Sequence, residues 1–409
     1  MKDWEKVKLG EICDFQEGYV NPSQKVPDYF GDEIKWIRAN DLNNGYVFDT
    51  SRKLSLKGFK SAGKSALLYE PNSIVISKSG TIGKLGIIKD FMCGNRATIN
   101  IKTKKDVADY KYVFYFLLRN QLEIADMAVG SVQRNLYTSI LGSVSLELPP
   151  LPEQKAIAAT LSCLDDKIEL NNRINKTLKE IAQAIFKSWF VDFEPFQDGE
   201  FEDSELGRIP KGWRVESLDN IADFLNGLAM QKYRSETDEF LPVIKIRELN
   251  QGFTDDSSDK ASVAIPEQYI INDGDVIFSW SGTLEVKIWT GEKGALNQHL
   301  FKVTSKKYEK WFYHLWTLKH LEKFRAIAQD KATTMGHIRR KDLTESKVLI
   351  PKDSDMKFLS NILNPIYEKI IKLYLENRTL KEIRDTLLPK LMSGEIRVAI
   401  EAVTTNKQG

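Results

Sequence analysis

The chain has 409 residues, of which 42% are hydrophobic and 28% charged, and its formal net charge is +2. That length exceeds one ordinary hydrophobic core and predicts two to three domains. The near-neutral charge does not point to nucleic acid, although basic groups gathered on one face would not change a sum. We expect no transmembrane helix, because no apolar run reaches about 18 residues, and no signal peptide. The three cysteines, Cys13, Cys93 and Cys163, match no zinc spacing and favour a reducing, cytoplasmic setting.

The first predicted elements recur later in the chain. Residues 4–15 and 213–224 share Trp, Leu, Ile, Asp and Phe at the same internal spacing. Residues 37–45 likewise resemble 246–252, with Arg38 matched to Arg247, and residues 74–81 match 276–283. Runs of β-branched or aromatic residues that end in small polar residues predict strands followed by tight turns.

Each copy then continues in the same way. An aromatic helix is predicted at about 110–122 and again at about 311–324, and a last strand at 144–148 and at 347–350. Each last strand runs into proline, which cannot continue the ladder of hydrogen bonds. The chain is therefore predicted to contain two copies of one mixed α/β unit of about 150 residues, a common domain size.

A long amphipathic helix follows each unit. The pentapeptide Thr-Leu-Lys-Glu-Ile at 177–181 recurs at 379–383, which is 202 residues later. Around both copies, mostly apolar residues recur at alternating steps of three and four, the seam of a coiled coil. The predicted seam is Ile157, Leu161, Leu164, Ile168, Asn171, Asn175, Leu178, Ala182, Ile185 and Trp189 in the first helix, and Leu359, Leu363, Ile366, Ile370, Leu373, Asn377, Leu380, Arg384, Leu387 and Leu391 in the second. Asn175 and Asn377 take equivalent places, where a polar residue lowers stability but fixes register.

These patterns predict the domain boundaries. We expect a first globule at 1–150, a helix with its end at 151–195, a linker with the second globule at 196–350, and a second helix with its tail at 351–409. Residues 194–210 are acidic and rich in glycine and proline, which is typical of a linker. Asn364 and Pro365 resemble an N-cap and a first turn, so we expect a kink or a restart of the second helix there.

A search for catalytic motifs finds little. Residues 78–85 fail the phosphate-loop pattern at both ends, no dinucleotide fingerprint is present, and the four histidines form no metal pair. Asp28, Glu33 and Lys35 formally resemble the metal site of many endonucleases. Their spacing is short and the second unit holds no copy, so an ordinary turn is the better interpretation.

Binding is the remaining interpretation, because loops on rigid scaffolds carry function. The predicted turns hold residue types that read base edges or contact phosphates, and the types differ between the two units. The candidates are Arg38, Asn40, Asn43, Asn44, Lys78, Ser79, Thr81, Lys84, Gln133, Arg134 and Asn135 in the first unit, and Lys245, Arg247, Asn250, Ser279, Ser281, Thr283, His337, Arg339 and Arg340 in the second. Each one alone is more simply an ordinary solvated loop residue, and the recurrence of the set in both units is what keeps the binding interpretation open.

The motifs around the helices carry a family resemblance. Residues 149–154, at the start of the first helix, resemble the opening of the central spacer in the specificity subunit of type I restriction-modification systems, and residues 186–193 resemble its close. Residues 388–398 resemble that family's C-terminal segment. The second helix departs from the family's Glu-Gln opening, because it offers Asp355, Met356 and Lys357 instead.

The resemblance implies an α+β fold, with two target recognition domains separated by two long antiparallel coiled-coil helices. Each domain would read one half of a split double-stranded DNA target, and the helices would set the gap. Two methylation subunits carrying S-adenosylmethionine would dock around the helices, and restriction subunits would supply ATP- and magnesium-dependent chemistry. This chain would then hold no cofactor, metal or active site. A self-sufficient endonuclease using Asp28, Glu33 and Lys35 is one alternative, and a coiled-coil scaffold that binds protein is another.

Overall fold

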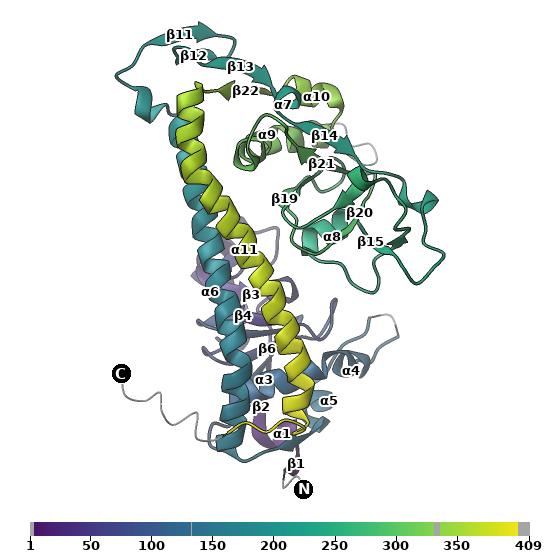
Figure 1. Cartoon of the computed structure of the whole chain (residues 1–409). Helices are drawn as coiled ribbons and strands as arrows, with labels where there is room; N and C mark the ends of the chain where they lie inside the picture. The colour runs from purple at the N-terminus through teal and green to yellow at the C-terminus, as the bar shows by residue number, and fades with distance from the viewer. Residues whose placement is uncertain (1–3, 132, 331–335, 400–409) are drawn as a thin grey trace. The chain divides into compact units, whose positions relative to one another are not determined.

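The computed structural model describes residues 4–131, 133–330 and 336–399. The chain divides into two compact units: Met1–Glu169 with Thr379–Gly409 form unit 1, and Leu170–Arg378 form unit 2. Each unit combines a mixed α/β body with stretches of two long helices, α6 (Leu151–Phe190) and α11 (Asp353–Met392) (Figure 1). The fold is α+β, as the sequence predicted. None of the described helices has the apolar stretch needed to cross a bilayer.

The described residues of unit 1 form three sheets. The largest has the order β2-β9-β6-β7-β4, with the strands Cys13–Glu17, Thr98–Thr103, Ile74–Ser77, Leu85–Ile88 and Gly45–Val47. A second sheet has the order β5-β3-β8, with Lys53–Leu54, Phe30–Ile37 and Met92–Gly94, and β1 (Glu5–Lys8) pairs with β10 (Ser145–Leu148). The shorter helices are α1 (Leu9–Ile12), α2 (Leu56–Lys60), α3 (Tyr110–Arg119), α4 (Gln121–Asp126) and α5 (Thr138–Ser143).

Unit 2 repeats this plan. Its main sheet has the order β14-β21-β18-β19, with Asp223–Asn226, Leu300–Thr304, Val276–Ser279 and Val286–Ile288. The second sheet has the order β16-β15-β20-β17, with Lys260–Ala261, Leu241–Ile244, Gly294–Leu296 and Ile270–Ile271, and β13 (Arg214–Ser217) pairs with β22 (Lys347–Ile350). The shorter helices are α7 (Leu218–Ile221), α8 (Ile246–Gln251), α9 (Lys310–Asp330) and α10 (Arg340–Thr344).

The central strands explain why each body folds around its main sheet. Every residue of β6 and of β18 is buried, as expected for apolar strands covered on both faces. The aromatic helices α3 and α9 supply the largest side chains of the two cores. In unit 2, Trp311, Phe312 and Trp316 pack with Phe186 and Phe190 of α6. The motif at the end of α6 therefore anchors that helix in the body of unit 2.

Within each unit, a stretch of α6 lies beside a stretch of α11, and the two run in opposite directions (Figure 1). In unit 1, Arg384 Nη1 donates to Asp165 Oδ1 over 2.7 Å. In unit 2, Asn171 Nδ2 donates to Asn377 Oδ1 over 2.9 Å, and Trp189 stacks on Phe358. Every predicted seam residue is buried or half-buried.

Of the kink or restart predicted at Asn364 and Pro365, the restart is wrong, because α11 runs unbroken from Asp353. Pro365 is exposed, and it removes one backbone hydrogen bond at a cost of about 3 kcal/mol. Leu363 and Tyr367 on either side are buried, and each such burial contributes roughly 1.5–3 kcal/mol. Packing of the seam therefore outweighs the break that proline favours.

The true start of α11 repeats that of α6. Trp4 Nε1 donates to Glu153 Oε2 over 3.1 Å in unit 1, and Trp213 Nε1 donates to Asp355 Oδ2 over 3.3 Å in unit 2. Asp355 thus takes the place of Glu153, which accounts for the missing Glu-Gln opening. In unit 1 the C-terminal segment adds a further contact, because Arg397 Nη1 donates to Glu153 Oε1 over 2.5 Å.

The predicted linker is also only partly a linker. Residues 201–210 form a hairpin of β11 (Phe201–Ser204) and β12 (Gly207–Pro210), with Gly207 in the left-handed conformation at its turn. Ile209 is buried in the core of unit 2, and Glu205 pairs with Lys347 over 3.3 Å. A single buried apolar residue among carboxylates leaves no periodic pattern, so composition alone missed the hairpin.

Candidate nucleic-acid interface

Three segments of unit 1 meet where β6 ends, and we call residues 78–81, 95–98 and 133–136 rim 1. The backbone N–H of Lys78 donates to the carbonyl of Ala97 over 2.8 Å, and the N–H of Leu136 donates to the carbonyl of Lys78 over 2.9 Å. The main chain of Lys78 is therefore held on both sides, by the segment that contains Ala97 and by the segment that contains Leu136. The structure thus brings the candidates Lys78, Ser79 and Thr81 together with Gln133 and Asn135.

Unit 2 builds the equivalent rim 2 from residues 280–283, 297–300 and 336–338. Trp280 N–H donates to the carbonyl of His299 over 3.4 Å, and Ile338 N–H donates to the carbonyl of Trp280 over 3.1 Å. Ser281 also forms a β-bridge with His337. The candidates Ser281, Thr283 and His337 are therefore neighbours, as their counterparts are in unit 1.

The turns of the two rims have the same internal chemistry. Ser77 Oγ donates to the carbonyl of Thr81 over 2.5 Å, and Ser279 Oγ donates to that of Thr283 over 2.5 Å. Gly80 and Gly282 follow with φ of 74° and 65°, a conformation that glycine adopts without steric cost. Ser279 is fully buried and holds the turn, while Thr81 and Thr283 are exposed.

Sequence reasoning missed a fourth part of each rim, the end of the first strand of the main sheet. A Cβ on Gly18 would lie 2.1 Å from the carbonyl oxygen of Asn95, and a Cβ on Gly227 would lie 2.2 Å from that of Asn297. These glycines therefore let the chain cross tightly against the rim. The residues just before them, Glu17 and Asn226, are carried to the rim by this crossing.

A carboxylate at a helix start supports a second group of candidates. Asp41 Oδ2 accepts the N–H of Arg38 over 2.9 Å in unit 1, and Glu248 Oε2 accepts the N–H of Lys245 over 3.1 Å in unit 2. Arg38 therefore corresponds to Lys245, and its predicted match with Arg247 is wrong. Both arginines pair with the carboxylate at the helix start, but Arg38 lies before the helix and Arg247 lies within it. Matching the two by residue type therefore paired positions that do not correspond.

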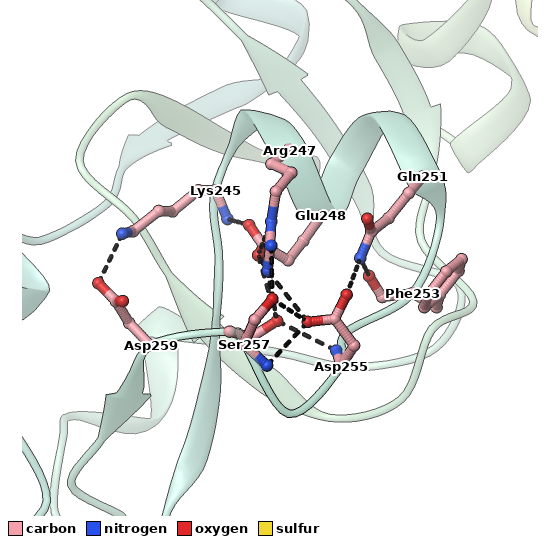
Figure 2. Close-up of polar contacts among 9 residues, drawn as sticks. Lys245, Arg247, Glu248, Gln251, Phe253, Asp255, Ser257 and Asp259 are labelled. Atoms are coloured by element: carbon pink, nitrogen blue, oxygen red, sulfur yellow. Dashed lines mark hydrogen bonds and ion pairs between the residues drawn. The ribbon is translucent and has the colours of Figure 1, made fainter. Parts of the chain in front are cut away.

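Figure 2 shows Arg247 at the centre of these contacts in unit 2. Its Nε donates to Glu248 Oε1 over 2.8 Å, its Nη1 to Ser257 Oγ over 2.6 Å, and its Nη2 to Asp255 Oδ1 over 3.2 Å. The hydrogen bond to Glu248 raises the pKa of Arg247, and the hydroxyl of Ser257 lowers that of Asp255. The guanidinium thereby ties the loop after α8 to the helix.

Lys245 lies at the edge of the same group (Figure 2). Its ammonium donates to Asp259 Oδ2 over 2.5 Å, and this hydrogen bond lowers the pKa of Asp259. Asp259 also lines an open cavity of about 380 Å³, together with Met230, Gln231, Arg234, Ser235 and Lys260. Basic side chains therefore border this part of unit 2.

Several further candidates have their polar groups bonded within unit 1. The amide of Asn44 exchanges hydrogen bonds with Gln121 and accepts the N–H of Leu85, while that of Asn43 stays within its own turn. The guanidinium of Arg134 donates to carbonyls at the end of α4, among them that of Asp126 over 2.7 Å.

In unit 2, Arg340 donates to the carbonyl of Phe224 over 3.1 Å. The candidates whose side chains the structure exposes include Asn40, Gln133, Asn250 and Arg339, and Lys84 is half-exposed.

The residues of the endonuclease alternative have other partners. Asp28 pairs with Lys57 over 3.1 Å, Glu33 accepts the N–H of Leu56 over 2.9 Å, and Lys35 donates to Asp90 over 2.8 Å. Within the part of the chain that the structure describes, no group of three or more His, Cys, Asp or Glu side chains could hold a metal ion. These contacts give the alternative no support.

Two similar bodies with differing rims are the architecture of a protein with two recognition domains. The family model for the type I restriction modification DNA specificity domain matches residues 1–180 and 210–383. The specificity subunit of the type I restriction enzyme MjaIX from Methanocaldococcus jannaschii is 31% identical, covering 97% of this chain and 94% of that protein. The HindI specificity subunit from Haemophilus influenzae is 23% identical, covering 97% and 100%.

A solved structure agrees with these matches. The crystal structure of the type I restriction-modification S subunit from M. genitalium covers 95% of this chain and 96% of its own, with a TM-score of 0.54 at 18% identity, and so shares the fold. The chain belongs to the family of type I restriction-modification DNA specificity subunits. The predicted resemblance is confirmed, and the scaffold alternative, like the endonuclease, is left without support.

Proposed function

We propose that unit 1 reads one half of a split double-stranded DNA target, that unit 2 reads the other half, and that the helix pair sets the gap between the halves. The observation that carries this proposal is the pair of rims. Their backbone hydrogen bonds match, while the side chains that they present differ. Such an arrangement suits two readers of different sequences, because base edges are distinguished by the donors and acceptors facing them.

The helix pair bounds the gap. A helix of 40 residues such as α6 spans about 60 Å at about 1.5 Å per residue, which limits the gap to under about 18 base pairs at about 3.4 Å each. Two recognition units must also meet the same face of the duplex, so the half-sites are expected about one helical turn apart.

We also propose that the chemistry lies on partner subunits in the cytoplasm. Two methylation subunits would supply S-adenosylmethionine, restriction subunits would supply ATP- and magnesium-dependent steps, and this chain would be non-catalytic. The repeated pentapeptide supports the pairing of two identical partners. Its last residue, Ile181 in one copy and Ile383 in the other, is 42% exposed in both, so each helix presents the same apolar side chain to a partner.

Insertion of one heptad tests this function. The insertion is placed in α6 between Leu178 and Ala182, with a matched one in α11 between Leu380 and Arg384. The complex with its methylation subunits is expressed in cells, and modified bases are mapped across the genome. We expect both half-sites to be unchanged and the gap to change. An unchanged gap in a complex that still methylates DNA contradicts the spacing role.

A further inference from the structure

Two side-chain pairs occupy the same place on the two rims but differ in chemistry. In rim 1, Lys78 Nζ donates to Glu17 Oε2 over 2.6 Å, and in rim 2, Trp280 Nε1 donates to Asn226 Oδ1 over 2.9 Å. Strand register confirms the equivalence. Glu17 lies opposite Ile99 on β9, and Asn226 lies opposite Phe301 on β21, which are equivalent strands of the two main sheets.

The pair in rim 1 sets a donor beside an acceptor. Lys78 and Glu17 keep 15% and 21% of their side-chain area exposed. An ammonium has three protons and a carboxylate several acceptor sites, so the bond between them leaves capacity on both. In the major groove, lysine donates to guanine O6 and N7, while a carboxylate accepts from the amino group of cytosine. Side by side, the two groups complement one G·C base pair.

The pair in rim 2 offers an amide and an aromatic face. The indole N–H is taken up by Asn226, whose Oδ1 has a second lone pair and whose Nδ2 is a donor. The indole ring lies 5.9 Å from the ring of His299 and 5.8 Å from that of Phe301, which hold it in place. Asparagine bonds adenine at N6 and N7, and apolar groups contact the methyl group of thymine. This pair complements an A·T base pair.

We infer that these two pairs determine base specificity, so that Glu17 with Lys78 reads a G·C base pair in the half-site of unit 1 and Asn226 with Trp280 reads an A·T base pair in that of unit 2. The inference rests on the proposed function, because it assigns one half-site to each unit. It adds Glu17, Asn226 and Trp280 to the candidate residues.

The test maps methylated motifs for the complex with its methylation subunits. In unit 1, Glu17→Gln combined with Lys78→Gln is expected to reduce discrimination at one G·C position by roughly tenfold, and only in one half-site. In unit 2, Asn226→Leu combined with Trp280→Ala is expected to relax one A·T position in the other half-site. Glu70→Gln with Lys102→Gln is the matched control, because it removes an ion pair of 2.8 Å in unit 1 outside the rim; its motif should stay unchanged.

A conservative variant guards against misfolding. Lys78→Arg keeps donors for guanine and is expected to retain the wild-type motif and the wild-type yield of complex. The inference is overturned if the rim variants methylate the unchanged motif, or if the position that relaxes in the half-site of unit 1 is an A·T pair.

Failure of the proposed function looks different. A wild-type motif without two separated halves would contradict it, and so would a unit 1 variant that alters both halves. A split motif with neither half altered would contradict only the assignment of these pairs.

Discussion

Asn175 is expected to destabilise the helix pair, and its replacement by leucine should make the protein more stable. Its side chain is 1% exposed, and among the described residues neither its amide oxygen nor its amide nitrogen has a hydrogen-bond partner. A buried polar group without a partner costs about 1–3 kcal/mol. Leucine has nearly the same shape, so Asn175→Leu should raise the free energy of unfolding by about that amount.

The repeat explains why this asparagine lacks a partner. Asn171 and Asn377 bond each other across the helix pair over 2.9 Å. The repeat of 202 residues equates Asn377 with Asn175 and Asn171 with Leu373. The second copy of the asparagine contact is therefore an asparagine facing a leucine, and Leu373 is itself buried. Asn377 therefore has an asparagine partner across the helix pair, whereas its counterpart Asn175 has none within the described part of the chain.

Thermal unfolding of the purified chain provides the assay. For a unit of this size, each kcal/mol shifts Tm by about 2–4 °C, so Asn175→Leu should raise Tm by roughly 2–12 °C. The matched control is Asn171→Leu, which removes donors to Asn377 and to Glu376 Oε2 over 3.0 Å and should lower Tm. The loss will be moderated because Asn171 Oδ1 has no partner among the described residues. Equal losses from both variants would refute this reasoning.

Two other predictions concern the seam and pH. Replacing both Leu178 and Leu380 with Asp places charges in the half-buried seam and should abolish co-purification with the methylation subunit. The control, with Asp at the exposed Thr177 and Thr379, should still co-purify. Normal co-purification of the seam variant would contradict the prediction. Burial lowers the pKa of His320 to about 4. As the pH falls, the histidine is therefore protonated in the unfolded chain at a higher pH than in the folded chain. The free energy of unfolding should fall by on the order of 3 kcal/mol between about pH 6.5 and pH 4. Urea unfolding at pH 7 and pH 5 should show a smaller fall for His320→Gln, and an unaltered pH slope would count against this.

The repeat of the α/β unit was predictable from sequence because equivalent residues make equivalent contacts in both copies. Trp4 and Trp213 are recognisable because each bonds a carboxylate near the start of a long helix. The seam was predictable because apolar burial imposes a period on the helix. Pro365 misled because local propensity is weaker than packing, and the burial of Tyr367 beside it depends on the tertiary fold.

The rims were only half predictable, for a topological reason. Lys78 and Ser79 stand next to a strand-and-turn pattern, so they were found. Glu17 is distant from Lys78 in sequence, and only the strand order β2-β9-β6 brings it beside the turn. Arg38 and Arg247 were matched by residue type, whereas the hydrogen bonds of Asp41 and Glu248 show which positions correspond.

The backbone hydrogen bonds of the two rims explain how the two recognition domains can differ in side chains while they keep one fold. Positions 78 and 280 are fixed by their own backbone N–H and carbonyl groups, so any side chain that fits at the rim leaves the turn in place. Gly18 and Ser77 have no such freedom, because a Cβ or a missing hydroxyl would disturb the turn directly. Changes of base preference at the rim should therefore leave the backbone of the turn in place, and the free energy of unfolding should change only through the side-chain pairs that they replace. On the proposed function, the residues that would read the bases are therefore not the residues that hold the turn.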